Sequence, residues 1–407
     1  MPAALNLTTV SGMAGEVETG LPIDWLQAQP YDEWAQVRRS DCPVVARGGS
    51  SFDPRTSFQV AAFKEAEAVM RDGETFSSAI NAEHIGQFMG ELILAMDGHE
   101  HRKYRNLVAK AFRASQLEQW DATLVRPAIN RLLDVIAPLG RADLVATVTG
   151  KYPVEVICGI VGVPLEDAEQ FAAWAEQVNT GPLAPARGHA ASQAMVDYLR
   201  PIVEARREEP AGDLISDLVH AEIDGERLTD AKIYGFLRLL LPAGAETTFR
   251  VMGNCLAALL THPDAMQAVV ANRALIPEVI EETLRWETSV TMVSRVSTRD
   301  TEVAGCPVPA GSPMNVLTGS ANRDETRWPD ADQWQLGRPH QHHLAFGTGQ
   351  HQCLGMHLAR LELRVGLDTI LDRLPNLRLD PDGEAPLIEG YAFRGPRALP
   401  VVFDATN

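Results

Sequence analysis

Residues 346–355 constrain the fold of this chain more than any other segment. They read FGTGQHQCLG, so three glycines flank Cys353, and an apolar-periodic stretch from Met356 to Leu371 follows at once. Glycine accepts positive φ and lets the backbone approach a flat ligand closely. Backbone N–H groups at the start of a helix stabilise a thiolate and lower the pKa of its thiol. The segment therefore predicts a loop that presents a thiolate ligand just before a helix.

Helical periodicity dominates the rest of the chain. Apolar residues recur every three to five positions, as in an amphipathic helix, in residues 117–136, 155–176, 191–207, 229–261, 275–287 and 354–373. Short strand-like runs occur at residues 43–46, 57–60, 301–303 and 399–403, while residues 78–98 and 304–347 look irregular. The pattern predicts a mainly α fold with a smaller β-rich region.

Charge and cysteine usage narrow the class of protein. The net charge is −18, which on average repels nucleic acid and anionic membranes. Five cysteines without metal or redox spacing favour a reducing compartment and mostly inert thiols. Residues 1–20 lack a basic start followed by an apolar stretch, so we expect a mobile N-terminal arm and a cytoplasmic protein.

A second polar motif lies in residues 239–248, which read LLLPAGAETT. Glu246 stands beside Thr247, directly after an Ala-Gly-Ala run, inside an otherwise apolar helical pattern. A carboxylate can relay protons and a hydroxyl can donate a hydrogen bond to a reacting group. An ordinary buried helix with one polar spot is the alternative interpretation.

Together these two segments resemble the cytochrome P450 family. The spacing F-G-x-G-x-H-x-C-x-G matches the family's haem-binding loop at every defined position, and residues 239–248 resemble the oxygen-activating stretch of its long central helix. The resemblance implies a cytochrome P450 fold, with residues 21–407 as one large helical domain with a smaller β-rich side. It also implies haem b, with Cys353 as the iron ligand.

The resemblance assigns further residues to the haem site. Glu246 and Thr247 would be catalytic, and Gly244 would leave room where oxygen and substrate meet the haem. Partners for the haem propionates would be His101 and Arg105, which form an H-x-x-x-R pair, together with Arg295 and His351. His99 is an alternative to His101. The implied haem contacts are His101, Arg105, Ala243, Gly244, Arg295, Phe346, Gly347, His351, Cys353 and Gly355.

An E-x-x-R pair, Glu282 and Arg285, lies on one face of a predicted helix. In the family such a pair is buried and is joined by an arginine from the irregular stretch before the cysteine loop. Arg338 is the matching residue here, although its surroundings contain fewer aromatic residues than is usual in the family. The resemblance implies a structural triad that holds the loop of Cys353.

The resemblance also implies a substrate and electron donors. The reaction would be hydroxylation of a hydrophobic small molecule (a terpenoid, steroid, fatty acid or aromatic) by O2, with electrons from a ferredoxin and its reductase. A basic patch of Lys110, Arg113, Arg360 and Arg364 would receive the ferredoxin. Candidate pocket residues, for which core packing is the alternative, are Ile85, Phe88, Met89, Leu240, Ala243, Thr291, Met292 and Phe393.

Three other functions stay open at this point. A peroxide-driven haem peroxygenase would not need the pair Glu246 and Thr247. A haem-based sensor would be expected to carry an output domain. A haem-free carrier protein would keep Cys353 as a buried thiol.

Overall fold

The computed structural model describes residues 7–11, 16–22, 28–40, 42–48 and 53–406 of the 407 residues. The predicted arm at residues 1–20 therefore lies partly outside the described residues. Its described parts are β1 Leu7–Ser11 and β2 Glu16–Pro22, which pair as antiparallel strands. That the arm is mobile stays a prediction.

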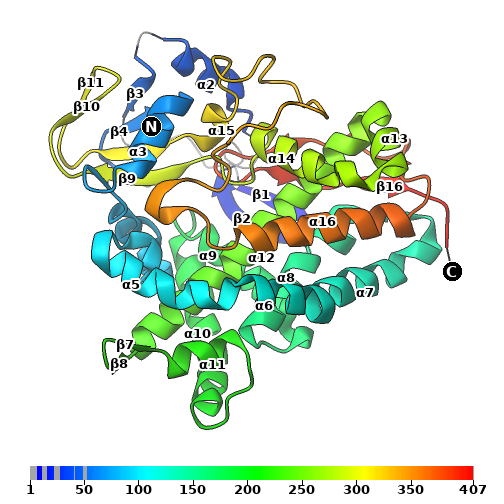
Figure 1. Ribbon diagram of the computed structural model, residues 1–407, viewed down its shortest axis with the longest axis horizontal. Helices are drawn as coiled ribbons and strands as arrows, with labels where there is room; N and C mark the ends of the chain where they lie inside the picture. The colour runs from blue at the N-terminus through cyan, green and yellow to red at the C-terminus, as the bar shows by residue number, and fades with distance from the viewer. Residues whose placement is uncertain (1–6, 12–15, 23–27, 41, 49–52, 407) are drawn as a thin grey trace.

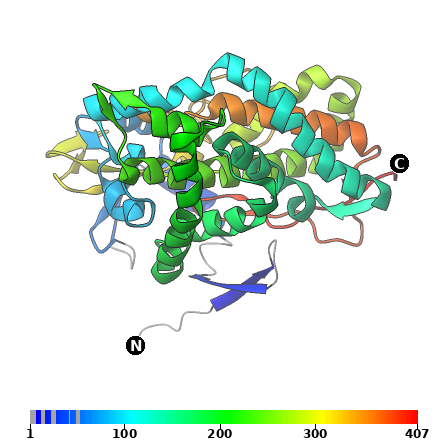
Figure 2. The same ribbon diagram turned by 90° about the horizontal axis from the view of Figure 1, so that it is seen from below.

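Helices fill the larger part of the molecule, which is flattened when it is seen from below (Figures 1 and 2). The described residues confirm a mainly α fold. The α-helices are α2 Tyr31–Arg38, α3 Phe63–Arg71, α4 Gln87–Met89, α5 Gly98–Ala109, α6 Ala114–Trp120, α7 Arg126–Ile136, α8 Tyr152–Val161, α9 Ala168–Asn179, α10 Pro185–Glu208, α11 Leu214–His220, α12 Asp230–Thr261, α13 Pro263–Ala271, α14 Ile276–Trp286, α15 Thr318–Ala321 and α16 Met356–Arg373.

The largest sheet lies on one side of the molecule, at the upper left of Figure 1. A five-stranded sheet has the order β3-β4-β12-β9-β5, in which β12 runs parallel to β4 and antiparallel to β9. The remaining strands form a three-stranded sheet and two-stranded pairs. Strand bounds after β2 are β3 Val44–Arg47, β4 Ser57–Val60, β5 Phe76–Ser77, β6 Arg141–Asp143, β7 Glu222–Ile223, β8 Glu226–Arg227, β9 Val293–Ser297, β10 Thr301–Val303, β11 Cys306–Val308, β12 Pro313–Val316, β13 Arg378–Leu379, β14 Ile388–Glu389, β15 Gly395–Pro396 and β16 Pro400–Val402.

The helical pattern at residues 155–176 covers parts of two helices in the structure. α8 ends at Val161 and α9 begins at Ala168. Gly162 between them has φ +99°, a conformation that glycine accepts at little cost. A Cβ at Gly162 would lie 2.2 Å from Oδ2 of Asp213, so the turn leaves no room for a side chain.

The core is built around α12, which passes behind α16 in Figure 1 and packs against α8, α9, α14 and α16. Most of α12 is buried on all sides, including Leu237, Leu241 and Leu256. A second apolar cluster, with Phe63, Val316 and Trp328, lies at the five-stranded sheet. Within the described ranges, no helix combines the length and the apolar character that a bilayer span requires.

The cysteines behave less uniformly than the sequence suggests. Cys158 and Cys255 are buried, and burial raises the pKa of each thiol to about 12, as expected for inert thiols. Cys42 and Cys306 instead form a disulfide, with their Cα atoms 6.2 Å apart. The prediction of mostly inert thiols does not cover this disulfide, because the fold brings together two cysteines that are 264 residues apart.

Candidate active site around Cys353

The loop of Cys353 is a tight backbone turn ahead of α16. The amide N–H of Cys353 donates to the carbonyl oxygen of Phe346 over 2.8 Å, which closes the loop. Gly347 and Gly349 have φ of +64° and +72°, so both need the freedom of glycine. A Cβ at Gly349 would lie 2.7 Å from the carbonyl oxygen of Met70. The loop is therefore shaped by its own hydrogen bond and by close contact with α3.

Cys353 is the only accessible free cysteine among the described residues. The protein that surrounds its sulfur raises the pKa of the thiol through loss of hydration. The backbone N–H of Gly355 and the positive charges of Arg105 and Arg360 oppose that shift. An accessible cysteine with an N–H group at its sulfur and two guanidinium charges nearby suits a thiolate ligand, since a bound cation removes the thiol proton.

Four basic side chains predicted as propionate partners meet beside this loop. The rings of His101 and His351 lie 4.1 Å apart between centroids, and Arg105 donates to the carbonyl oxygen of Gln352. The charges of Arg105 and Arg295 both lower the pKa of His351, after burial, which is the larger cause. His101 is 1% exposed, whereas His99 is exposed, so the structure places His101 in the cluster.

This cluster holds more basic groups than anions, since Asp97 is the only carboxylate that the structure places at ion-pair distance from one of its described members. Arg295 is 4% exposed and donates to the carbonyl oxygen of Ser294, and burial lowers its pKa to about 10. Nδ1 of His101 and Nε2 of His351 are buried without a hydrogen-bond partner. Buried cationic and N–H groups without acceptors are costly, so the site fits a ligand that carries carboxylates. The two propionates of haem are such groups, and the loop of Cys353 lies beside the cluster that would hold them.

Asp97 is a site residue that the sequence reasoning missed. Its carboxylate accepts hydrogen bonds from Ser77 Oγ, from the N–H of Ser78 and from Nε2 of Gln350. It lies 3.5 Å from Nε2 of His351, an ion-pair distance rather than a hydrogen bond. Burial opposes ionisation, but His351, Ser77 and the N–H of Ser78 hold the pKa of Asp97 below its usual value. In the sequence, the only indication of this role is that Asp97 comes directly before α5, the helix that carries His101.

Glu246 and Thr247 lie on α12, as predicted. Oε1 of Glu246 accepts from Nε and Nη2 of Arg250, and Oε2 accepts from Nδ2 of Asn179 over 2.7 Å. The hydroxyl of Thr247 donates to the carbonyl oxygen of Ala243 over 2.7 Å. Both side chains are thus engaged within the protein, and the hydroxyl of Thr247 must turn before it can donate to a ligand.

The structure shows a packing requirement for glycine at position 244. A Cβ there would lie 2.8 Å from Cγ1 of Ile157, on α8. The missing side chain therefore lets α12 pack closely on α8, and the role of Gly244 at the haem stays a prediction. Ala243, one residue earlier, keeps an accessible side chain.

The structure joins all three members of the expected triad. Arg285 donates to Glu282 through Nε and Nη2, each over 2.8 Å, and Nε of Arg338 donates to Glu282 over 2.9 Å. The arginines also donate to backbone carbonyls of residues 322, 329–331 and 333. Because these carbonyls belong to the stretch that leads to Cys353, the triad holds that stretch onto α14.

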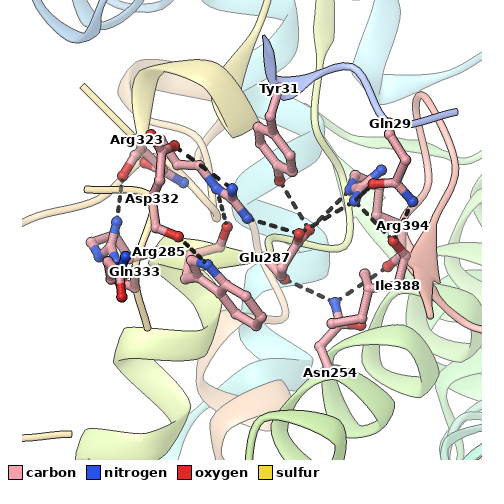
Figure 3. Close-up of polar contacts among 12 residues, drawn as sticks. Gln29, Tyr31, Asn254, Arg285, Glu287, Arg323, Asp332, Gln333, Ile388 and Arg394 are labelled. Carbon is pink, nitrogen blue, oxygen red and sulfur yellow. Dashed lines mark hydrogen bonds and ion pairs between the residues drawn. The ribbon is translucent and has the colours of Figure 1, made fainter. Parts of the chain in front are cut away.

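A second buried ionic network was not foreseen (Figure 3). Glu287, directly after α14, accepts from Tyr31 Oη over 2.9 Å, from Arg323 Nη2 over 2.8 Å and from Arg394 Nε over 2.9 Å. Its own carbonyl accepts from Nδ2 of Asn254 on α12. Burial and the charge of Glu287 raise the pKa of Tyr31 to about 12. The network ties α2, α12, α14 and the C-terminal strands together.

Several predicted pocket residues are packed in the core. Phe88 is fully buried against Gly181 and Gly188, where added Cβ atoms would lie 2.9 Å from its ring. Thr291 is also fully buried and donates to the carbonyl oxygen of Tyr391. Met89 is only 2% exposed. For these three the pocket prediction is wrong, because a residue without accessible surface cannot line an accessible pocket.

The other pocket candidates are partly exposed. Ile85 lies in a short π-helical turn before α4, and Leu240 lies on α12. Met292 packs near Trp34, and Phe393 pairs with Val290 through an isolated β-bridge. With Ala243, these residues stay predictions as substrate contacts.

Comparison with known proteins agrees with this site. Residues 184–391 match the family model described as Cytochrome P450. The mycinamicin IV hydroxylase/epoxidase of Micromonospora griseorubida is 34% identical over 97% of this chain and 96% of its own length. The steroid C26-monooxygenase of Mycolicibacterium smegmatis is 34% identical over 76% of this chain and 79% of its own.

A solved structure extends the similarity to the fold. Cytochrome P450 CYP109Q5 from Chondromyces apiculatus superimposes with a TM-score of 0.84 at 31% identity, covering 95% of this chain and 98% of its own. The match in sequence, fold and thiolate loop leads to one assignment. This chain belongs to the cytochrome P450 family of haem-thiolate monooxygenases.

Proposed function

We propose that this protein binds haem b through Cys353 and hydroxylates a hydrophobic small molecule. One oxygen atom of O2 would enter the product and the other would leave as water, with two protons and two electrons supplied from outside. The observation that carries the proposal is the accessible thiol of Cys353 beside the anion-deficient cluster of His101, Arg105, Arg295 and His351.

Each residue of the site has a distinct part in this proposal. Haem supplies the oxygen-activating chemistry when it is bound. Arg105 and Arg295 would bind its propionates, with His101 and His351 as hydrogen-bond partners. Phe346, Gly347 and Gly355 shape the loop around the sulfur, and the accessible face of Ala243 lies on the helix that carries Glu246 and Thr247.

Glu246 and Thr247 would handle protons. Thr247 would release the carbonyl of Ala243 and donate its hydroxyl hydrogen where oxygen is activated, and Glu246 would relay protons from water. Replacing Thr247 by Ala should keep haem binding but release more reducing equivalents as hydrogen peroxide, whereas Thr247→Ser should not. Unchanged coupling in Thr247→Ala would remove this residue from the reaction.

The substrate would be a hydrophobic small molecule such as a terpenoid, steroid, fatty acid or aromatic. Two relatives are named for a steroid and for mycinamicin IV, and the partly exposed candidates Ile85, Leu240, Ala243, Met292 and Phe393 are apolar. A ligand panel tests this, because an apolar compound that binds should shift the Soret band. No shift with any of them would contradict the proposal.

A ferredoxin with its reductase would supply the electrons, in the cytoplasm. Arg113 and Arg364 are exposed near a groove of about 600 Å³ between α6, α14 and α16, and Lys110 belongs to the same predicted patch. Reversing the charge of Arg113 and Arg364 should slow reduction and weaken its dependence on salt. Unchanged reduction rates would place docking elsewhere.

The first test is the absorption spectrum of the purified protein, reduced and bound to carbon monoxide. A strongly red-shifted Soret band would establish haem and thiolate together, and Cys353→Ala should lose that band. A protein without haem, or with an imidazole-like spectrum, would refute the proposal. Product formation with peroxide but not with NAD(P)H and redox partners would favour the peroxygenase.

A further inference from the structure

Arg360, on α16, is anchored more firmly than an exposed docking charge would be. Its Nε and Nη2 donate to Oε1 and Oε2 of Glu281 over 2.7 and 2.8 Å, a bidentate pair. The side chains of Arg360 and Glu281 are 34% and 21% exposed, so solvent screens the pair only in part. Arg360 therefore holds one position relative to α14.

His343 completes the anchor. The N–H of Ala345 donates to Nδ1 of His343, so the ring hydrogen lies on Nε2 and is donated to Oε2 of Glu281 over 3.2 Å. Burial opposes ionisation of Glu281, but Arg360 and His343 together lower its pKa to about 2. Glu281 is therefore an anion at neutral pH, fixed between α16 and the segment that leads into the cysteine loop.

The anchored guanidinium faces the cysteine loop. Cζ of Arg360 lies 4.6 Å from the ring centroid of Phe346, the residue whose carbonyl accepts the N–H of Cys353. Glu281 binds Nε and Nη2 of Arg360, whereas the guanidinium itself lies over the ring of Phe346. Of the two charges in the pair, the positive one thus contacts the loop of Cys353.

We propose that Arg360, held by Glu281 and His343 against Phe346, is a positioning residue that raises the reduction potential of the haem bound at Cys353. A fixed positive charge stabilises the site after it has gained an electron. The inference rests on the proposed haem-thiolate function. It assigns Arg360 to tuning of the haem instead of to the docking patch in which the sequence placed it.

The test is a spectroelectrochemical titration of the haem-loaded protein. Arg360→Met removes the positive charge and should lower the midpoint potential, whereas Arg360→Lys should stay near the wild-type value. Glu281→Gln leaves the charge of Arg360 uncompensated and should raise the potential. Arg364→Met, one turn further along α16 and exposed, is the matched control and should leave the potential unchanged.

Opposite shifts separate charge from structure, since damage to the loop would move Arg360→Met and Glu281→Gln in the same direction. Shifts of the same sign, or equal potentials in wild type and Arg360→Met, would overturn the inference. If Arg360→Met fails to bind haem, the midpoint potential of Glu281→Gln still tests the inference, because it is expected to rise above the wild-type value. A wild-type protein without the thiolate carbon monoxide band would instead refute the proposed function itself.

Discussion

His101 shows how a single buried side chain ties stability to pH. Burial, then the charges of His351 and Arg105, lower its pKa from 6.5 to about 4, with Arg102 acting in the same direction and Asp97 against it. The unfolded chain therefore binds this proton more readily than the folded protein does. Stability from His101 is complete above pH 6.5 and is lost as the pH falls from 6.5 to about 4.

We expect His101→Gln to reduce this pH dependence. The free energy of unfolding of the wild type, measured in urea between pH 7 and 4.5, should fall more steeply than that of His101→Gln. His99→Gln changes an exposed ring two residues away and should keep the wild-type slope. Equal slopes in all three proteins would show that His101 does not remain neutral in the folded state.

Between elements, the contact of α12 with α8 depends on Gly244. Alanine in an exposed helix interior is better than glycine by about 1 kcal/mol. Here the added Cβ would lie 2.8 Å from Cγ1 of Ile157, closer than side chains tolerate. Overpacking of this kind costs about 1–3 kcal/mol, so the clash outweighs the helix propensity.

Gly244→Ala should therefore lower the free energy of unfolding, by up to about 2 kcal/mol once the gain in helix propensity is subtracted, in urea or thermal denaturation. Gly86→Ala is the control, since its nearest contacts to an added Cβ are an ordinary 3.5 Å and 3.7 Å. Adding Ile157→Val to Gly244→Ala should recover part of the loss. A stabilised Gly244→Ala protein would contradict the close packing of the two helices.

Over the whole molecule, the network of Glu287 connects segments from both ends of the chain. It joins Tyr31 near the N-terminus, Arg323 in the irregular stretch and Arg394 near the C-terminus (Figure 3). Arg394 is 1% exposed and also donates to the carbonyl oxygens of Ala28, Ile388 and Gly390. Removing one charge from such a network leaves the others buried without a partner.

Arg394→Met should lower the free energy of unfolding by about 3–5 kcal/mol. Arg200→Met, on α10, breaks an ion pair with Asp197 in which the two side chains are 52% and 57% exposed, and should cost less than about 1 kcal/mol. Urea unfolding followed by circular dichroism compares the two. Similar losses in both variants would mean that the buried network contributes no more than a surface pair.

The sequence by itself determined the family, the cysteine loop and most helices, because these depend on residues close together in the chain. Gly347, Gly349 and Cys353 lie within seven positions, and the turn they form is local. The E-x-x-R pair is local too, since its members are one helical turn apart.

Only the tertiary structure decided which distant groups meet. Asp97 lies beside His351, Glu281 binds Arg360, and Phe88 is buried against Gly181, although nothing in their sequence neighbourhoods pairs them. Gly244 is a further example, because the side chain that an added Cβ would meet, Ile157, lies on another helix, α8. Periodicity specifies which face of a helix is apolar, but the partner of a polar or missing side chain is set by how the helices pack.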